Sequence, residues 1–197
     1  GKLMLSGRYY EKTIRLDHAN PIIHLHYRII NQSDLQKSFL WKLHAALTIN
    51  PGDKLITDAK KAKIVDPKYS QFTFAEEFFW PIIENSNASF IPSPNGTMDF
   101  FYLYDIQHGE MQLVNNTDES LFAYNYDPLV FPYQWYFASY GKFFGHHVAI
   151  LEPCTCMPIS VNEARIKKRC SILNPGQEIS TSVRIYAGEK SKYSNNG

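Results

Sequence analysis

The sequence predicts an all-β fold, an antiparallel β-sandwich with one or two short helices. Many short segments alternate apolar and polar residues, and turn-forming residues separate nearly all of them. The chain lacks the alternation of strands with helices that is typical of parallel sheets. At 197 residues, of which 44% are hydrophobic and 15% aromatic, the composition suits one domain with a packed core. We expect this domain to cover residues 1–190 and a disordered tail to cover residues 191–197.

The strand signals are clearest near the N-terminus. Residues 9–16 and 22–30 both alternate with a period of two, which is typical of half-buried antiparallel strands. Residues 17–21, which lie between them, are rich in turn formers, so a hairpin is expected. The same reasoning predicts further strands over residues 39–49, 100–105, 110–115, 120–126, 134–137, 147–152 and 180–186.

One short surface helix is expected over residues 160–168. It opens with Ser160, and Glu163 follows three residues later, which matches a capping box. Residues 70–79 also contain good helix formers, but this stretch stops at Trp80-Pro81.

Charge and cysteine content exclude some classes of function. Twenty Lys and Arg against 19 Asp and Glu give a net charge of +1, so we expect no nucleic-acid partner. The lysine-rich residues 58–63 are expected to form a solvated loop. The three cysteines cannot all pair with one another, and the sequence shows neither a signal peptide nor an apolar run of about 18 residues. These observations predict a cytoplasmic protein with no membrane partner.

Three histidines are candidates for chemistry. His24 and His26 share one strand face at a spacing that can hold a metal, but no third ligand is visible nearby, so a polar exposed face is favoured and no metal site is expected. His44 lies in the apolar segment 39–49. It is interpreted either as a buried neutral imidazole with one backbone partner or as a half-desolvated acid–base group.

Glu152 is the carboxylate with the strongest signal for chemistry. It ends the apolar run 148–151 and precedes a loop that contains two prolines. Partial desolvation would make it a stronger base, and the equally weighted alternative is a rim carboxylate paired with a lysine or arginine. Aromatic residues, Trp80 and Tyr133 among them, crowd the sequence ahead of it. Most must be core, but a few exposed rings beside a carboxylate and a histidine would form a sugar-stacking site.

Two stretches resemble the aldose 1-epimerase, or galactose mutarotase-like, family. Phe39-Leu40-Trp41-Lys42-Leu43-His44, followed by residues 49–53, is similar to the segment that bears the catalytic histidine of the family. Residues 151–160 are similar to its catalytic-glutamate segment. Shorter matches follow in order at residues 80–81, 131–133, 140–141 and 173–176. The resemblance covers residues from about Tyr9 to Gly188.

The resemblance implies a supersandwich fold with a sugar-binding cleft across one sheet. It implies that His44 is the general acid on the ring oxygen and Glu152 the general base on the anomeric hydroxyl. Asp99 is the nearest match to the substrate-binding aspartate of the family, Asp127 is the second choice, and Trp80 and Tyr133 are the candidate sugar-contacting aromatics. The family also has strands ahead of this region that supply an arginine and another histidine, so we expect the chain to lack its N-terminal strands.

The sequence therefore predicts an isomerase that interconverts the anomers of a hexose or a related sugar without a metal or another cofactor. Two groups that hold and release protons on either side of a hemiacetal suffice for that reaction. The alternative is a non-catalytic carbohydrate-binding β-sandwich module. In both hypotheses the partner is a small-molecule sugar.

Overall fold

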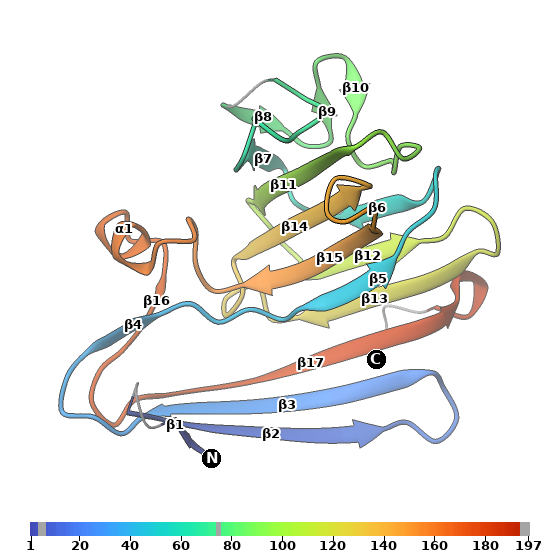
Figure 1. Ribbon diagram of the computed structural model, residues 1–197. Helices are drawn as coiled ribbons and strands as arrows, with labels where there is room; N and C mark the ends of the chain where they lie inside the picture. Colours follow the sequence, from blue (N-terminus) through green and yellow to red (C-terminus); the bar gives the residue numbers. More distant parts are fainter. Residues whose placement is uncertain (4–6, 74–75, 194–197) are drawn as a thin grey trace.

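The computed structural model describes residues 1–3, 7–73 and 76–193 (Figure 1). Two large sheets of seven and six strands pack face to face, and every strand pair in them is antiparallel. The predicted antiparallel β-sandwich is therefore confirmed. Among the described residues, no helix has the length and apolar composition needed to cross a lipid bilayer.

The seven-stranded sheet contains the predicted N-terminal hairpin, drawn in blue in Figure 1. The side chain of Asp17 stabilises the hairpin turn, because its Oδ1 accepts hydrogen bonds from the backbone N–H groups of Ala19 and Asn20 at 2.9 and 2.8 Å. In spatial order the strands are β1 (Lys2–Leu3), β2 (Arg8–Leu16), β3 (Ile22–Asn31), β17 (Glu178–Glu189), β13 (Ser120–Tyr126), β12 (Glu110–Val114) and β6 (Lys54–Thr57).

The six-stranded sheet presents one face to the core and the other outward. On its strand β15, Ala149 and Leu151 are fully buried in the core, so the alternate residues Val148, Ile150 and Glu152 point to the outward face. In spatial order the strands are β5 (Ala45–Thr48), β15 (His147–Cys154), β14 (Tyr133–Tyr140), β11 (Thr97–Tyr104), β7 (Lys61–Ile64) and β8 (Glu77–Phe79). Two small pairs flank the sandwich, β9 (Ile82–Ile83) with β10 (Ser86–Asn87) and β4 (Lys37–Phe39) with β16 (Ser171–Leu173).

A large apolar cluster of buried residues joins the two sheets. Leu25 and Val183 from one sheet belong to the same buried cluster as Phe101 and Leu151 from the other. Within it, the ring of Phe101 stacks on that of Tyr136, with centroids 6.2 Å apart and planes only 6° from parallel. Burial of each such side chain contributes about 1.5–3 kcal/mol to stability. The outward face of the six-stranded sheet is partly covered, because Tyr102 and Trp135 are buried against Met157 and Ala164.

The predicted strand over residues 39–49 is wrong in its middle. Strand β4 ends at Phe39 and β5 begins at Ala45, and the irregular segment between them runs beside the end of β15. The backbone N–H of Leu43 donates to the carbonyl of Pro153 (3.0 Å). Because proline has no N–H to donate in return, the ladder lacks one hydrogen bond here, and pairing beyond it is reduced to the single bridge between Lys42 and Cys154.

The predicted loop over residues 58–63 is also partly wrong, because residues 61–64 form β7. Ala62 and Ile64 are buried, while Lys61 and Lys63 alternate with them on the other face. A period of two was therefore present in this segment, hidden by its lysines.

The predicted helix and the predicted tail have different outcomes. Helix α1 (Val161–Ile166) forms as expected, and Ser160 Oγ accepts the backbone N–H of Glu163 at 3.3 Å. Part of the predicted tail is structured, because a 3₁₀ turn covers Lys190–Lys192 and the ring of Tyr193 packs on that of Tyr186 at 5.1 Å. Residues 194–197 lie outside the described residues.

Candidate functional site

Glu152 lies near the end of β15, on the outward face of the six-stranded sheet. Its side chain is only 4% exposed. The cross-strand neighbour of Glu152 is Trp135 on β14, whose indole Nε1 donates to the backbone carbonyl of Cys156 at 2.9 Å. The strand thus holds a carboxylate against a fixed aromatic wall.

Two side chains of the irregular segment 40–44 reach this carboxylate. Lys42 Nζ lies 2.6 Å from Oε2 of Glu152, and His44 Nε2 lies 3.4 Å from Oε1. The Lys42 ammonium also lies 4.9 Å from the ring centroid of Trp135, which adds a cation–π contact. Glu152 is therefore both desolvated and paired with a lysine, which combines the two interpretations drawn from the sequence.

The interpretation of His44 as a buried imidazole is wrong, because its side chain is 51% exposed. The break in the predicted strand explains this exposure: residues 40–44 lie outside the regular ladder, at the rim of the sheet. The His44 side chain is consequently open to solvent, whereas that of Glu152 is enclosed by protein.

A cleft of about 650 Å³ opens beside Glu152 on the same outward face. This volume is typical of pockets that hold small molecules. The walls are mainly apolar and aromatic, and they include Phe100, Trp135, Phe137, Phe143 and Ile150, with Lys42 and Glu152 at one end. His44 does not line the cleft and contacts Glu152 from the exposed rim. His146 and His147 both contribute to the lining.

Asp99 and Trp80 lie on the opposite side of this sheet. Asp99, 1% exposed, accepts hydrogen bonds from Ser70 Oγ (2.5 Å) and Gln71 Nε2 (2.7 Å), and burial raises the pKa of its carboxyl group. The Trp80 ring packs against the core residue Phe101, with centroids 5.7 Å apart. The structure does not bring either residue to the cleft. The sequence could have predicted this position for Asp99. Asp99 and Phe101 are two residues apart on β11, so their side chains lie on the same, core-facing side of the sheet.

Asp127 and Tyr133 also lie outside the cleft. Asp127 caps the turn after β13, where its Oδ1 accepts the backbone N–H of Leu129 at 2.8 Å. Tyr133 is on the outward face with Trp135, but it lines a neighbouring hollow that includes Arg169. Of the six residues proposed from the sequence, the structure brings together only His44 and Glu152.

The sequence reasoning missed Lys42 and the apolar walls. Lys42 lies two residues before His44, and both contact the same carboxylate. Phe100 and Phe137 are direct cross-strand partners, which period-two alternation places on one face once the register is known. The sequence alone does not show how strands that are distant along the chain pair with one another, so it could not predict which residues form these walls.

The described part of the chain contains no group of three or more His, Cys, Asp or Glu side chains placed to hold an ion. The ring nitrogens of His26 lie 3.2 and 3.3 Å from the hydroxyls of Ser182 and Ser180. The favoured interpretation of His24 and His26, a polar strand face, agrees with this arrangement.

Comparison with known proteins identifies the fold. No protein-family model matches the chain, and no curated protein matches its sequence. Solved structures do match: a Klebsiella pneumoniae protein provisionally named an aldose 1-epimerase (TM-score 0.69, 14% identity) is covered over 47% of its length by 93% of this chain. Galactose mutarotase-like proteins from Clostridium acetobutylicum (TM-score 0.65, 15% identity) and Lactobacillus casei (TM-score 0.63, 10% identity) are covered over 56% and 69% of their lengths by 92% and 91% of this chain.

The chain therefore has the galactose mutarotase-like β-sandwich fold, as the sequence resemblance implied. It spans about half to two thirds of the length of these structures. At such low identity the likeness extends to the fold alone, and what the site does must be argued from its own residues.

Proposed function

We propose that the cleft binds a pyranose sugar and that Glu152 and His44 interconvert its anomers. The observation that carries this proposal is the contact of a buried carboxylate with a half-exposed imidazole (3.4 Å) beside an aromatic-walled cleft. Apolar and aromatic walls suit the faces of a sugar ring, Glu152 suits its anomeric hydroxyl, and His44 at the adjoining rim suits its ring oxygen.

The proposed reaction needs only two proton transfers. Glu152 accepts the proton of the anomeric hydroxyl as the bond between C1 and the ring oxygen breaks, and His44 donates a proton to that oxygen. Rotation about C1–C2 turns the aldehyde, and the ring closes on its other face. His44 then takes back the proton from the closing hydroxyl, and Glu152 returns its proton to the new anomeric oxygen, so both groups end as they began.

The reaction requires His44 to move away from Glu152. At 3.4 Å the two groups contact each other, so no sugar atom fits between them in this arrangement. Since His44 is 51% exposed, its side chain can rotate toward solvent without disrupting the core.

A non-catalytic sugar-binding function is the second candidate. The hydrogen bond from Lys42 favours it, because one oxygen of Glu152 is already occupied at 2.6 Å. The same cleft would then hold the sugar through its walls, with no proton transfer.

Polarimetry on freshly dissolved α-anomers of common aldoses tests the proposal. The protein should accelerate mutarotation, and Glu152→Gln should remove roughly a hundred- to ten-thousand-fold of that acceleration. Glu178→Gln is the matched control, because it alters a carboxylate that is ion-paired with Arg28 on the other sheet (2.7 Å). Saturable sugar binding by calorimetry without acceleration would favour the binding module, and the absence of both would contradict the two hypotheses together.

A further inference from the structure

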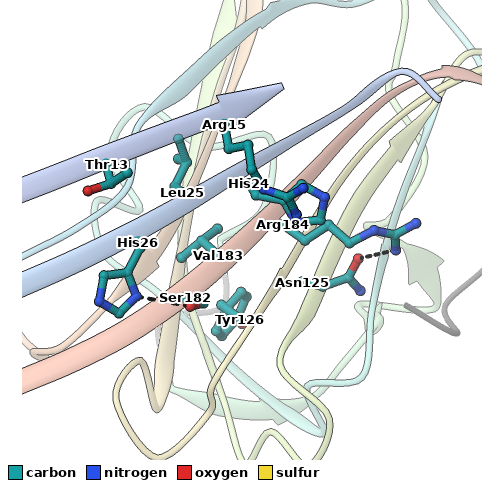
Figure 2. A pocket seen from close by; sticks show the side chains of 10 residues that line it. All are labelled: Thr13, Arg15, His24, Leu25, His26, Asn125, Tyr126, Ser182, Val183 and Arg184. Atoms are coloured by element: carbon teal, nitrogen blue, oxygen red, sulfur yellow. Dashed lines mark hydrogen bonds between the residues drawn. The ribbon is translucent and has the colours of Figure 1, made fainter. Parts of the chain in front are cut away.

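The outward face of the seven-stranded sheet carries a second hollow, of about 560 Å³ (Figure 2). Two rows of side chains border it, and within each row the residues are direct cross-strand neighbours on β2, β3 and β17. One row holds Arg15, His24 and Arg184, and the other holds Thr13, His26 and Ser182.

The floor between the rows is backbone. Leu25 and Val183 lie between the rows on β3 and β17, and their side chains are buried in the core on the other side of the sheet. Their peptide groups therefore border the hollow. The hollow therefore has polar side chains at its borders and backbone at its floor.

The lining is rich in positive charge. No carboxylate is among the residues that line the hollow. Arg15 and Arg184 flank His24 in one cross-strand row, so two guanidinium groups lie on either side of one imidazole.

Neighbouring side chains hold parts of this lining in place. Arg184 Nη1 donates to Asn125 Oδ1 at 3.2 Å, and its guanidinium lies 5.7 Å from the ring of Tyr193. Asn125 in turn donates to Glu110 Oε1 on the neighbouring strand β12 at 3.2 Å. This positioning reduces the conformational entropy that a ligand must remove when it binds.

We propose that this hollow binds the oxyanion of a small molecule, a phosphate or sulfate ester. Guanidinium groups bind such oxyanions through paired N–H donors, and the hydroxyls of Thr13 and Ser182 add neutral donors from the opposite row. The volume exceeds that of the anion alone and leaves room for the group that carries it. The hollow and Glu152 are on different sheets, so this proposal does not depend on the one for the cleft.

Calorimetric titration with inorganic phosphate, inorganic sulfate and glycerol 3-phosphate tests the proposal, with glycerol as the neutral counterpart of the ester. We expect saturable binding of the anions that weakens with added salt, and none of glycerol. In NMR spectra the ring signals of His24 and His26 should shift during the titration and those of His44 should not. Binding of phosphate but not sulfate, or the reverse, would identify the ester class.

Variants on the same sheet face provide the controls. Arg15→Gln changes an exposed side chain and should lower anion affinity about tenfold or more, as should Arg184→Gln. Arg28→Gln removes an equal charge from the same face outside the hollow, so it should leave affinity unchanged. The absence of saturable binding, unmoved signals of His24 and His26, or an equal loss in Arg28→Gln would overturn the proposal.

Discussion

The ammonium of Lys42 donates a 2.6 Å hydrogen bond to a carboxylate of Glu152 that is only 4% exposed. The pair is unequal, because the Lys42 side chain is 31% exposed and can turn to water. Loss of the lysine leaves a buried charge with one remaining neighbour, whereas loss of the carboxylate leaves a lysine that solvent can accommodate.

The first prediction follows from this inequality. Lys42→Met should lower the free energy of unfolding by about 1–3 kcal/mol, toward the lower end because solvent partly screens the exposed lysine. Glu152→Gln should lower the free energy of unfolding by a smaller amount. The double variant should lose less stability than the two single variants lose together. Urea unfolding of all four proteins measures the coupling. Simple additivity would show that the pair contributes nothing.

The second prediction concerns the aromatic wall of the cleft. Phe143 lines the cleft and is 55% exposed, while the adjacent Phe144 is 85% exposed and does not line it. Phe143→Ser should weaken sugar binding about fivefold or more, because a ring that stacks on a sugar face contributes about 1 kcal/mol. Because the Phe144 ring contacts that of Phe143, with centroids 4.9 Å apart, Phe144→Ser should weaken binding less than Phe143→Ser in the same calorimetric titration. Equal effects would place the sugar elsewhere.

The third prediction concerns Asp99, whose carboxyl pKa burial raises above the ordinary value of 3.8. A raised folded-state pKa means that the folded protein holds this proton more tightly than the unfolded chain. The stabilisation is fully present below the unfolded value and is lost as the pH rises through the folded one. Asp99→Asn removes this titration, so the difference in stability between variant and wild type should change in favour of the variant as the pH rises above about 4.

Thermal unfolding at a series of pH values checks the Asp99 prediction. Asn keeps an oxygen that can accept from Ser70, which bonds Asp99 at 2.5 Å, so the variant is expected to fold. If the difference in stability between the variant and the wild type does not change with pH, the pKa of Asp99 is not raised. If the variant instead becomes less stable relative to the wild type as the pH rises, the pKa is lowered rather than raised.

Most strands could be predicted from the sequence because each buries one face. Strands β3 and β15 alternate so regularly that only one register buries their apolar side chains, whereas β2 alternates equally well but leaves Ile14 58% and Leu16 63% exposed. Strand β7 was missed because its exposed lysines dominate its composition while its buried positions, Ala62 and Ile64, are few. The break before Ala45 depends on Pro153, more than 100 residues away, and no local pattern reveals it.

The candidate site shows the same division. The positions of Glu152 and His44 came from short motifs, and the structure brings the two side chains together. Their substrate roles stay predictions. Strand alternation alone places Asp99 on the core side of the sheet, away from Glu152 and His44, so the sequence was sufficient to predict its position. The contact between Lys42 and Glu152 could not be predicted from the sequence, because it depends on how an irregular segment lies against β15.

The last prediction concerns two glycines with left-handed backbone conformations. Gly109 has φ +68°, and a Cβ there would lie 2.1 Å from the carbonyl oxygen of Tyr126. The two residues are also joined by a hydrogen bond, which the backbone N–H of Tyr126 donates to the carbonyl of Gly109 at 2.9 Å. Gly96 has φ +75°, but a Cβ there meets nothing within 4 Å. Gly96→Ala should therefore cost about 1–2 kcal/mol from backbone strain alone. Gly109→Ala should exceed it by about 1–3 kcal/mol, because β12 and β13 must separate to relieve the clash. Urea unfolding of both variants measures the difference, and equal losses would contradict the close approach at Gly109.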